Sequence, residues 1–276
     1  MKNLIVNIFK TLFFFDLTAV IWLKHMPELK AKNEALLTLK QETAFLILPL
    51  ALTLIFWLLV EKRKVGVPIN KKVIGSALWG IAFGVVPIAV IIGVLKLFKV
   101  VQFSGFNKPS HIWIWIAALF LKVLTVELLF RGYLFNLYKK HHGTIFAVIA
   151  TTALYISLYS EILKTPKIYR ANIILFNILL CFILDRYGSI ITTVLARFCY
   201  TFISCMLFGS LYSGENYPTI LNTAFKNKPF FVDSHYFLEG SKITLVVLIL
   251  LTATLIILKY NLIAKGKIFI AKFKKK

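Results

Sequence analysis

Acidic residues and cysteines are scarce in this chain, and each scarcity excludes classes of protein. Only 11 Asp and Glu stand against 33 Lys and Arg, and 59% of the 276 residues are hydrophobic while 16% are charged. This composition excludes an intrinsically disordered chain and a soluble nucleic-acid-binding domain, despite the net charge of +22. The three cysteines, at 181, 199 and 205, lie in apolar runs without a CxxC spacing, so they indicate packing rather than disulfide, redox or metal chemistry.

Long apolar runs, in contrast, recur along the whole chain. A membrane-spanning helix needs roughly 17–25 mostly apolar residues. About eight windows approach or meet this length, at 4–23, 43–60, 73–95, 112–137, 143–163, 171–185, 189–212 and 243–260. The sequence therefore predicts an all-α fold, a polytopic membrane helix bundle of about eight transmembrane helices. We expect the first window to be a retained span, and residues 1–276 to form a single membrane domain, because no repeat or linker divides them.

The basic residues predict the orientation of this bundle. They gather in short segments between the apolar windows, most densely at 62–72 and 265–276. Cytoplasmic loops carry an excess of Lys and Arg, and eight spans place both segments on one side. We therefore expect a cell-membrane protein with its N- and C-termini in the cytoplasm. The polybasic tail, 261–276, interleaves Ile and Phe with lysines, which favours contact with anionic lipids of the bilayer.

Ionisable side chains inside the apolar windows each need a partner or a task, because burying one in a bilayer costs at least ~2.5–3.5 kcal/mol. Five stand out: Asp16, Lys122, Glu127, Arg131 and Arg197. Glu127 and Arg131 are four residues apart on one helix face, which predicts a structural ion pair. Lys122 points about 140° away from Glu127, so we expect it to face another cavity or to reach outward. Lys10, near the end of the first window, is expected to reach the cytoplasmic interface.

The residues around this pair carry a resemblance to a known family. The stretch VELLFRGYLF resembles the first motif, EExxxR followed by Gly, of the CAAX-protease and bacteriocin-processing (CPBP, abortive-infection) family of intramembrane proteases. Glu127, Arg131 and Gly132 match that motif, whereas Val126 stands in place of its first Glu. The resemblance covers about 115–255, including an echo of the family's closing Gly-Leu-Glu-Gly-Ser segment at 237–241.

The second and third motifs of the family are present only in their context. Tyr155 and Tyr159 occupy the Phe and His positions of FxxxH, and Arg197 and Thr201 occupy the His and Asn positions of HxxxN. The resemblance implies a cavity lined by Glu127, Arg131, Tyr155, Tyr159, Arg197 and Thr201. These six residues and Val126 are the seven family-equivalent positions.

The chemistry that the resemblance implies is peptide-bond hydrolysis. In the family, the first Glu and the second-motif His activate a water, while the third-motif His and Asn stabilise the oxyanion. Here Val126 cannot take a proton, and Tyr159, with an ordinary phenol pKa of about 10, is a poor base at neutral pH. None of the predicted spans contains a His, and the sequence has no HExxH or GxSxG motif for an alternative hydrolase. We therefore expect no metal or cofactor, and name none of these positions as catalytic.

The leading hypothesis is a catalytically degenerate member of this family in a bacterial cytoplasmic membrane. It would act as a binding, immunity or regulatory partner of another membrane or cell-envelope protein rather than as an enzyme. One alternative is a divergent, active CAAX-type endopeptidase that uses Glu127. The other is a small-molecule transporter, with Asp16, Lys122 and Arg197 along its pathway.

Overall fold

The computed structural model describes residues 2–24, 28–210, 217–226, 228, 230–232 and 236–273. Side chains are described within these ranges except at 2, 3, 19, 23, 24 and 260–273. The side chains of the polybasic tail 261–276, and with them its predicted contact with anionic lipids, therefore lie outside the described residues.

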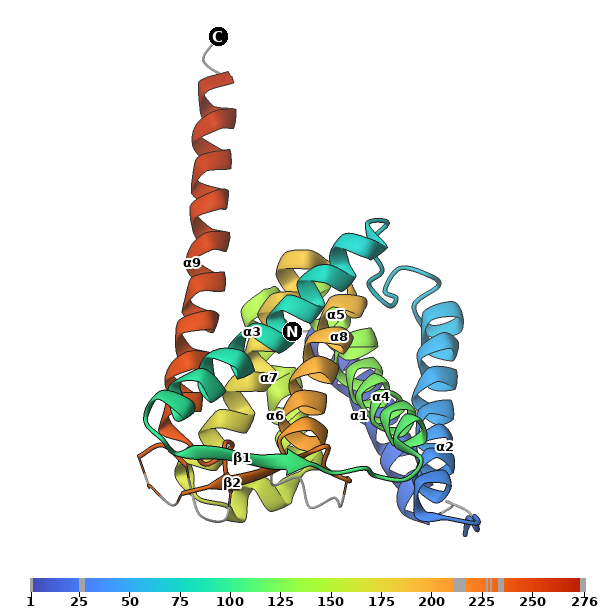
Figure 1. Cartoon of the computed structure of the whole chain (residues 1–276). Helices are drawn as coiled ribbons and strands as arrows, with labels where there is room; N and C mark the ends of the chain where they lie inside the picture. Colours follow the sequence, from blue (N-terminus) through green and yellow to red (C-terminus); the bar gives the residue numbers. More distant parts are fainter. Residues whose placement is uncertain are drawn as a thin grey trace.

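The described residues form a bundle of long helices (Figure 1). The α-helices are α1 Lys2–Lys24, α2 Glu34–Ile55, α3 Val73–Leu97, α4 Ile112–Glu127, α5 Phe135–His142, α6 Thr144–Leu158, α7 Lys167–Tyr187, α8 Ile190–Thr201 and α9 Lys242–Phe273. Three π-helical segments continue α2, α4 and α8, namely η1 Phe56–Val60, η2 Leu128–Leu134 and η4 Phe202–Leu207, and a 3₁₀ segment, η3 Ser160–Lys164, follows α6. Since η2 joins α4 to α5, each of the eight predicted windows contains one helical segment, and the predicted all-α membrane bundle is confirmed.

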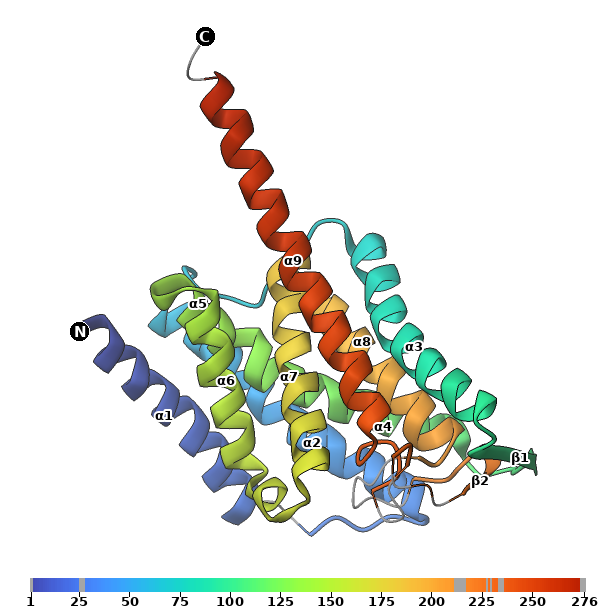
Figure 2. The same cartoon turned by 90° about the vertical axis from the view of Figure 1, so that its left-hand side faces the viewer.

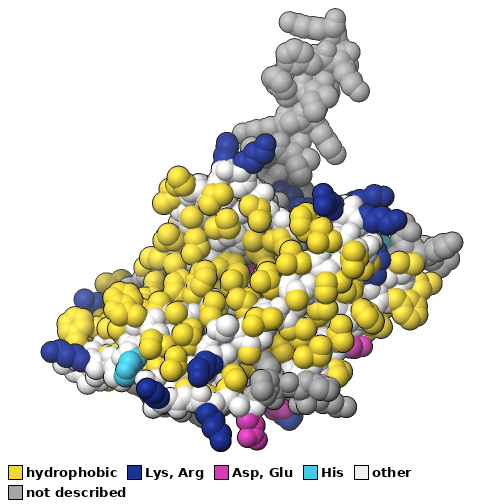
Figure 3. All heavy atoms as spheres, turned by 90° about the vertical axis from the view of Figure 1, so that its right-hand side faces the viewer, with side chains coloured by type: hydrophobic (Ala, Val, Ile, Leu, Met, Phe, Trp, Pro, Cys, Tyr) yellow, Lys and Arg dark blue, Asp and Glu magenta, His cyan; other side chains and the backbone are white. Residues whose placement is uncertain are grey.

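Seven of the described helical segments are long and apolar enough to cross a membrane. The remaining segment, α6, has 15 residues and is shorter than a typical span. The window at 171–185, which is the shortest in the sequence, lies within the 21-residue helix α7. Hydrophobic side chains cover most of one broad face of the bundle, with Lys and Arg mainly toward its two ends (Figure 3). The protein is therefore a polytopic membrane protein in a lipid environment.

Two short strands, which the sequence analysis did not predict, close one end of the bundle. Strand β1, Val101–Phe106, pairs antiparallel with β2, Leu221–Phe225, with a bulge between Phe103 and Gly105. The strands lie in the connections between α3 and α4 and between α8 and α9 (Figure 1). They therefore tie together two connections that are more than a hundred residues apart in the sequence.

Helices α3 and α8 approach each other closely at two glycines of α3. A Cβ atom at Gly80 would lie 2.7 Å from the carbonyl oxygen of Thr192, and one at Gly84 would lie 2.6 Å from that of Ala196. Such a small-residue spacing lets two membrane helices bring their backbones together. The position of α8, and of the Arg197 side chain that it carries, therefore depends on these two glycines.

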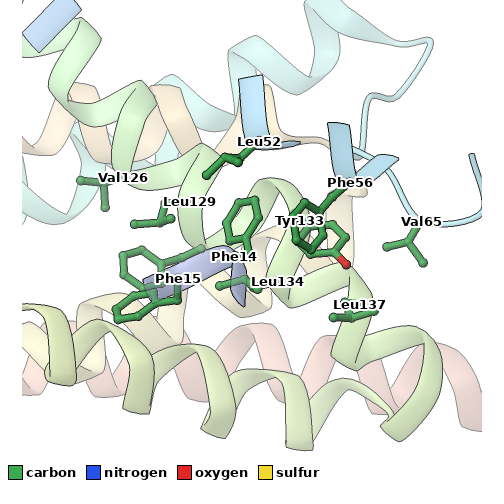
Figure 4. Close-up of a cluster of buried hydrophobic side chains, with 11 residues drawn as sticks. Phe14, Phe15, Leu52, Phe56, Val65, Val126, Leu129, Tyr133, Leu134 and Leu137 are labelled. Carbon is green, nitrogen blue, oxygen red and sulfur yellow. The ribbon is translucent and has the colours of Figure 1, made fainter. Parts of the chain in front are cut away.

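An apolar core is shared by α1, α2 with η1, and residues 126–137 (Figure 4). At its edge Lys10 Nζ lies 2.6 Å from Glu61 Oε1, and the Tyr133 hydroxyl donates to the same oxygen at 3.0 Å. Lys10 is therefore paired with a buried carboxylate just beyond the second window, a partner that the sequence did not identify. Asp16, in contrast, is exposed on the surface of α1.

The orientation of the bundle in the membrane is a prediction that labelling can test. The basic segment 62–72 and the β1–β2 sheet lie at opposite ends of the bundle (Figures 1 and 2). In a variant whose three cysteines are replaced by Ala, we expect Lys71→Cys to be protected from a membrane-impermeant thiol reagent in intact cells. The matched exposed position at the other end, Ser104→Cys, should be labelled. The reverse pattern would contradict cytoplasmic termini.

Candidate functional site

The site is built around a carboxylate in the middle of the bundle. Glu127 is the last residue of α4, and the π-helical segment η2, which carries Arg131, begins immediately after it. Arg131 Nη1 lies 3.3 Å from Glu127 Oε1, and both side chains are almost completely buried. The ion pair predicted from their spacing is therefore present. π-Helical turns within α-helices occur frequently at functional sites.

A second guanidinium, from α8, reaches the same carboxylate oxygen. Arg197 Nε lies 2.7 Å from Glu127 Oε1. The two arginines also converge on Asn177 of α7, whose Oδ1 accepts a hydrogen bond from Arg131 Nη2 at 2.9 Å and from Arg197 Nη2 at 2.7 Å. Glu127, Arg131, Asn177 and Arg197, hereafter the charged cluster, thus join α4, η2, α7 and α8. Its formal charge is +1, since one carboxylate faces two guanidinium groups.

Asn177 is the member of the charged cluster that was not expected from the sequence. Ionisable groups are not the only side chains that need a partner inside an apolar window, because an amide there needs hydrogen-bond partners as well. Asn172 and Asn177 both interrupt the window 171–185 and are both buried. Asn172 donates from Nδ2 to the backbone oxygens of Glu239 and Ser241. Its side chain therefore holds the segment 237–241 against α7. The presence of two amides within one apolar window was the sequence signal that could have identified Asn177.

A cavity of about 630 Å³ lies next to the charged cluster, and Arg197 forms part of its wall. Five of the seven family-equivalent residues line it: Val126, Tyr155, Tyr159, Arg197 and Thr201. The prediction that Glu127 and Arg131 also line it is wrong, because both lie behind its wall. Successive residues of a helix point about 100° apart. With Val126 facing the cavity, Glu127 is consequently directed toward α7 and α8.

The prediction for Lys122 is also corrected, because this lysine lines the same cavity as Arg197. Leu119, Lys122, Val123 and Val126 follow the spacing of one helix face and all line the cavity. The cavity thus lies on the lysine's face of α4 rather than on the glutamate's. Glu42 of α2 interacts electrostatically with Lys122.

Aromatic rings hold Arg197 in place at the cavity wall. Its guanidinium carbon lies 5.5 Å from the ring centroid of Tyr155 and 5.7 Å from that of Phe176, distances typical of cation–π contacts. The Tyr155 ring in turn packs against Tyr159, with centroids 4.7 Å apart, and against Phe130, at 5.4 Å. Tyr155 and Tyr159, which occupy the second-motif positions, therefore support Arg197, which occupies the His position of the third motif.

This arrangement offers hydrogen-bond donors to the cavity but no base at the position where the family has its first Glu. Val126 occupies that position, while Arg197, Tyr155, Tyr159 and Thr201 can donate N–H or O–H groups. No group of three His, Cys, Asp or Glu side chains that could hold a metal ion occurs among the residues the structure describes. Chemically, the wall can bind an electron-rich group and fix its orientation.

Comparison with known proteins agrees with the resemblance seen in the sequence. Residues 108–203, about a third of the chain, match the family model described as type II CAAX prenyl endopeptidase Rce1-like. The matched segment runs from the start of α4 into η4 and contains all seven family-equivalent positions. No curated protein and no solved structure matches the chain. The predicted resemblance to the CAAX-protease family is thus confirmed over residues 108–203, which match its Rce1-like model.

Proposed function

We propose that this protein is a catalytically degenerate member of the CAAX-protease family that binds a ligand or partner in its cavity without hydrolysing it. The observation that supports the proposal is the position of Glu127. It is the remaining carboxylate of the first motif, it is completely buried, and its Oε1 contacts both Arg131 and Arg197 behind the cavity wall. A carboxylate in this position stabilises the packing of three helices.

A general base must come within about 2.6–3.2 Å of the proton that it removes, directly or through one water. Glu127 does not line the cavity, so a water bound there meets Val126 in its place. Bringing the carboxylate to the cavity would require α4 to rotate and would leave two buried guanidinium groups without their counterion. That rearrangement is costly, because breaking a buried ion pair typically costs about 3–5 kcal/mol.

The remaining donors suit recognition. Preorganised donors stabilise negative charge in catalysis when a nucleophile generates that charge. Without the nucleophile, the same donors bind a group that is already anionic or strongly polar. The protein would then act as a binding, immunity or regulatory partner of another membrane or cell-envelope protein, from a bacterial cytoplasmic membrane with both termini in the cytoplasm. Residues 1–276 would form one membrane domain, with the tail 261–276 on anionic lipid.

We expect the purified protein, reconstituted in lipid, to leave prenylated and membrane-embedded test peptides uncleaved when products are measured by mass spectrometry. The Glu127→Gln variant should give the same background as the unmodified protein. Glu61→Gln is the matched control, since Glu61 is another buried carboxylate with a basic partner, but its partner is Lys10 rather than Arg197 of the cavity wall. Cleavage that Glu127→Gln abolishes and Glu61→Gln retains would refute the proposal and make Glu127 the general base.

A further inference from the structure

The cavity is polarised, with positive charge at its inner wall. The charged cluster carries a formal charge of +1, and Arg197 is its member that lines the cavity. An uncompensated charge buried among membrane helices is costly and favours a counterion. The inner wall is therefore suited to a bound anion.

The other ionised groups that line the cavity are Lys122, Glu161, Lys164 and Glu239. Glu161 and Lys164 form an exposed ion pair at 2.8 Å, and Lys122 interacts electrostatically with Glu42. The Glu239 carboxylate belongs to a segment held by Asn172, which precedes Asn177 by five residues, or about 7.5 Å along α7. An anion is thus attracted to the Arg197 end of the cavity.

Neutral donors and apolar side chains complete the cavity. Tyr155, Tyr159 and Thr201 add hydroxyl groups to the wall that contains Arg197, and the stacked rings keep its guanidinium fixed. Other parts of the lining are apolar, contributed by Leu119 and Val123 of α4, Ile173 of α7 and Leu248 of α9. A volume of about 630 Å³ is within the range of about 300–1,000 Å³ for small-molecule sites.

We propose that this cavity binds a single-chain amphiphilic anion, with a carboxylate or phosphate at Arg197 and a hydrocarbon chain along the apolar wall. The inference rests on the proposed binding function and specifies its ligand class. The bilayer is the source, because the apolar wall is built by helices that cross the membrane, and such helices are in direct contact with lipid chains. Carboxylate and phosphate share the recognition chemistry, since a guanidinium binds either through charge-assisted hydrogen bonds.

The test uses the full-length protein in phosphatidylcholine nanodiscs and three probes with the same twelve-carbon chain. Labelled dodecanoate should bind saturably relative to empty nanodiscs, whereas unlabelled dodecanol should compete poorly because it carries no charge. Dodecyl phosphate is the third probe: competition assigns the site to both head groups, and a lack of competition restricts it to carboxylates. Absence of saturable binding of either anion, or equal competition by dodecanol, would overturn the proposal.

Two variants locate the site. Arg197→Gln leaves the Glu127–Arg131 pair intact and should weaken anion binding by at least about tenfold, since hydrogen bonds to charged groups are the stronger ones. Tyr159→Phe keeps the ring contact with Tyr155 and should weaken it about threefold to tenfold through loss of one hydroxyl. Tyr187→Phe, whose ring packs on Trp79 outside the cavity, is the matched control and should bind as the unmodified protein does.

Anion binding that neither cavity variant changes would also overturn the assignment. The peptide-cleavage assay on the same preparation separates this inference from the function on which it rests. Failure of anion binding without cleavage would contradict the ligand class alone, whereas Glu127-dependent cleavage would contradict the binding function.

Discussion

Replacing Glu127 by Gln should lower the free energy of unfolding by about 3–5 kcal/mol, because it leaves Arg131 and Arg197 buried together without a counterion. Arg131→Met should cost less, since it leaves Glu127 paired with Arg197 at 2.7 Å and makes the charged cluster neutral. The double variant, Glu127→Gln with Arg131→Met, should be less destabilised than the sum of the single variants, because contacting residues couple. Unfolding in mixed detergent micelles, followed by circular dichroism, measures all three.

An exposed pair in the same protein gives the matched control for this prediction. Glu161 and Lys164 are three residues apart and lie 2.8 Å from each other, with side chains that are 79% and 75% exposed. Surface pairs contribute little to stability because water screens them. Glu161→Gln should therefore leave the unfolding midpoint nearly unchanged. An equal effect of Glu127→Gln and Glu161→Gln, or strict additivity of the buried pair, would show that the charged cluster does not stabilise the bundle.

Replacing Gly84 by Ala should destabilise the protein by about 1–3 kcal/mol, the usual cost of overpacking a tight contact. The added Cβ would lie 2.6 Å from the carbonyl oxygen of Ala196 and 2.6 Å from the Cβ of Cys199, so α8 would have to move away from α3. Because α8 carries Arg197, the contact between Arg197 and Glu127 should loosen as well. Thermal unfolding and dodecanoate binding by the same sample report these two effects.

Gly93 gives the control on the same helix. Its added Cβ would have no neighbour within 4 Å, and the residue is exposed on α3. Gly93→Ala should therefore stabilise the protein, by up to about 1 kcal/mol, through the higher helix propensity of Ala. If Gly84→Ala and Gly93→Ala shift the unfolding midpoint in the same direction, the close approach of α3 and α8 does not control the stability of the bundle.

Local sequence determined the helices and the resemblance to the CAAX-protease family. A membrane span must satisfy its backbone hydrogen bonds within itself, so the apolar windows alone locate the helical segments. The spacing of Glu127 and Arg131 likewise determines their pairing, because two residues four apart lie on the same face of one helix and need no other element to meet. The cost of burying a charge further predicts that Arg197 has a partner, although it does not identify Glu127 and Asn177 as the groups that Arg197 contacts.

Only the tertiary structure decided which helix faces meet. The spacing of Lys122, Val126 and Glu127 gives their relative angles on the helix. The packing of α4 against α2 and α8 is what places the first two at the cavity and the third behind it. The β1–β2 pairing and the Glu61 contact with Lys10 likewise join segments distant in sequence. Such contacts depend on the simultaneous positions of several helices, and a periodicity along one helix carries no information about its neighbours.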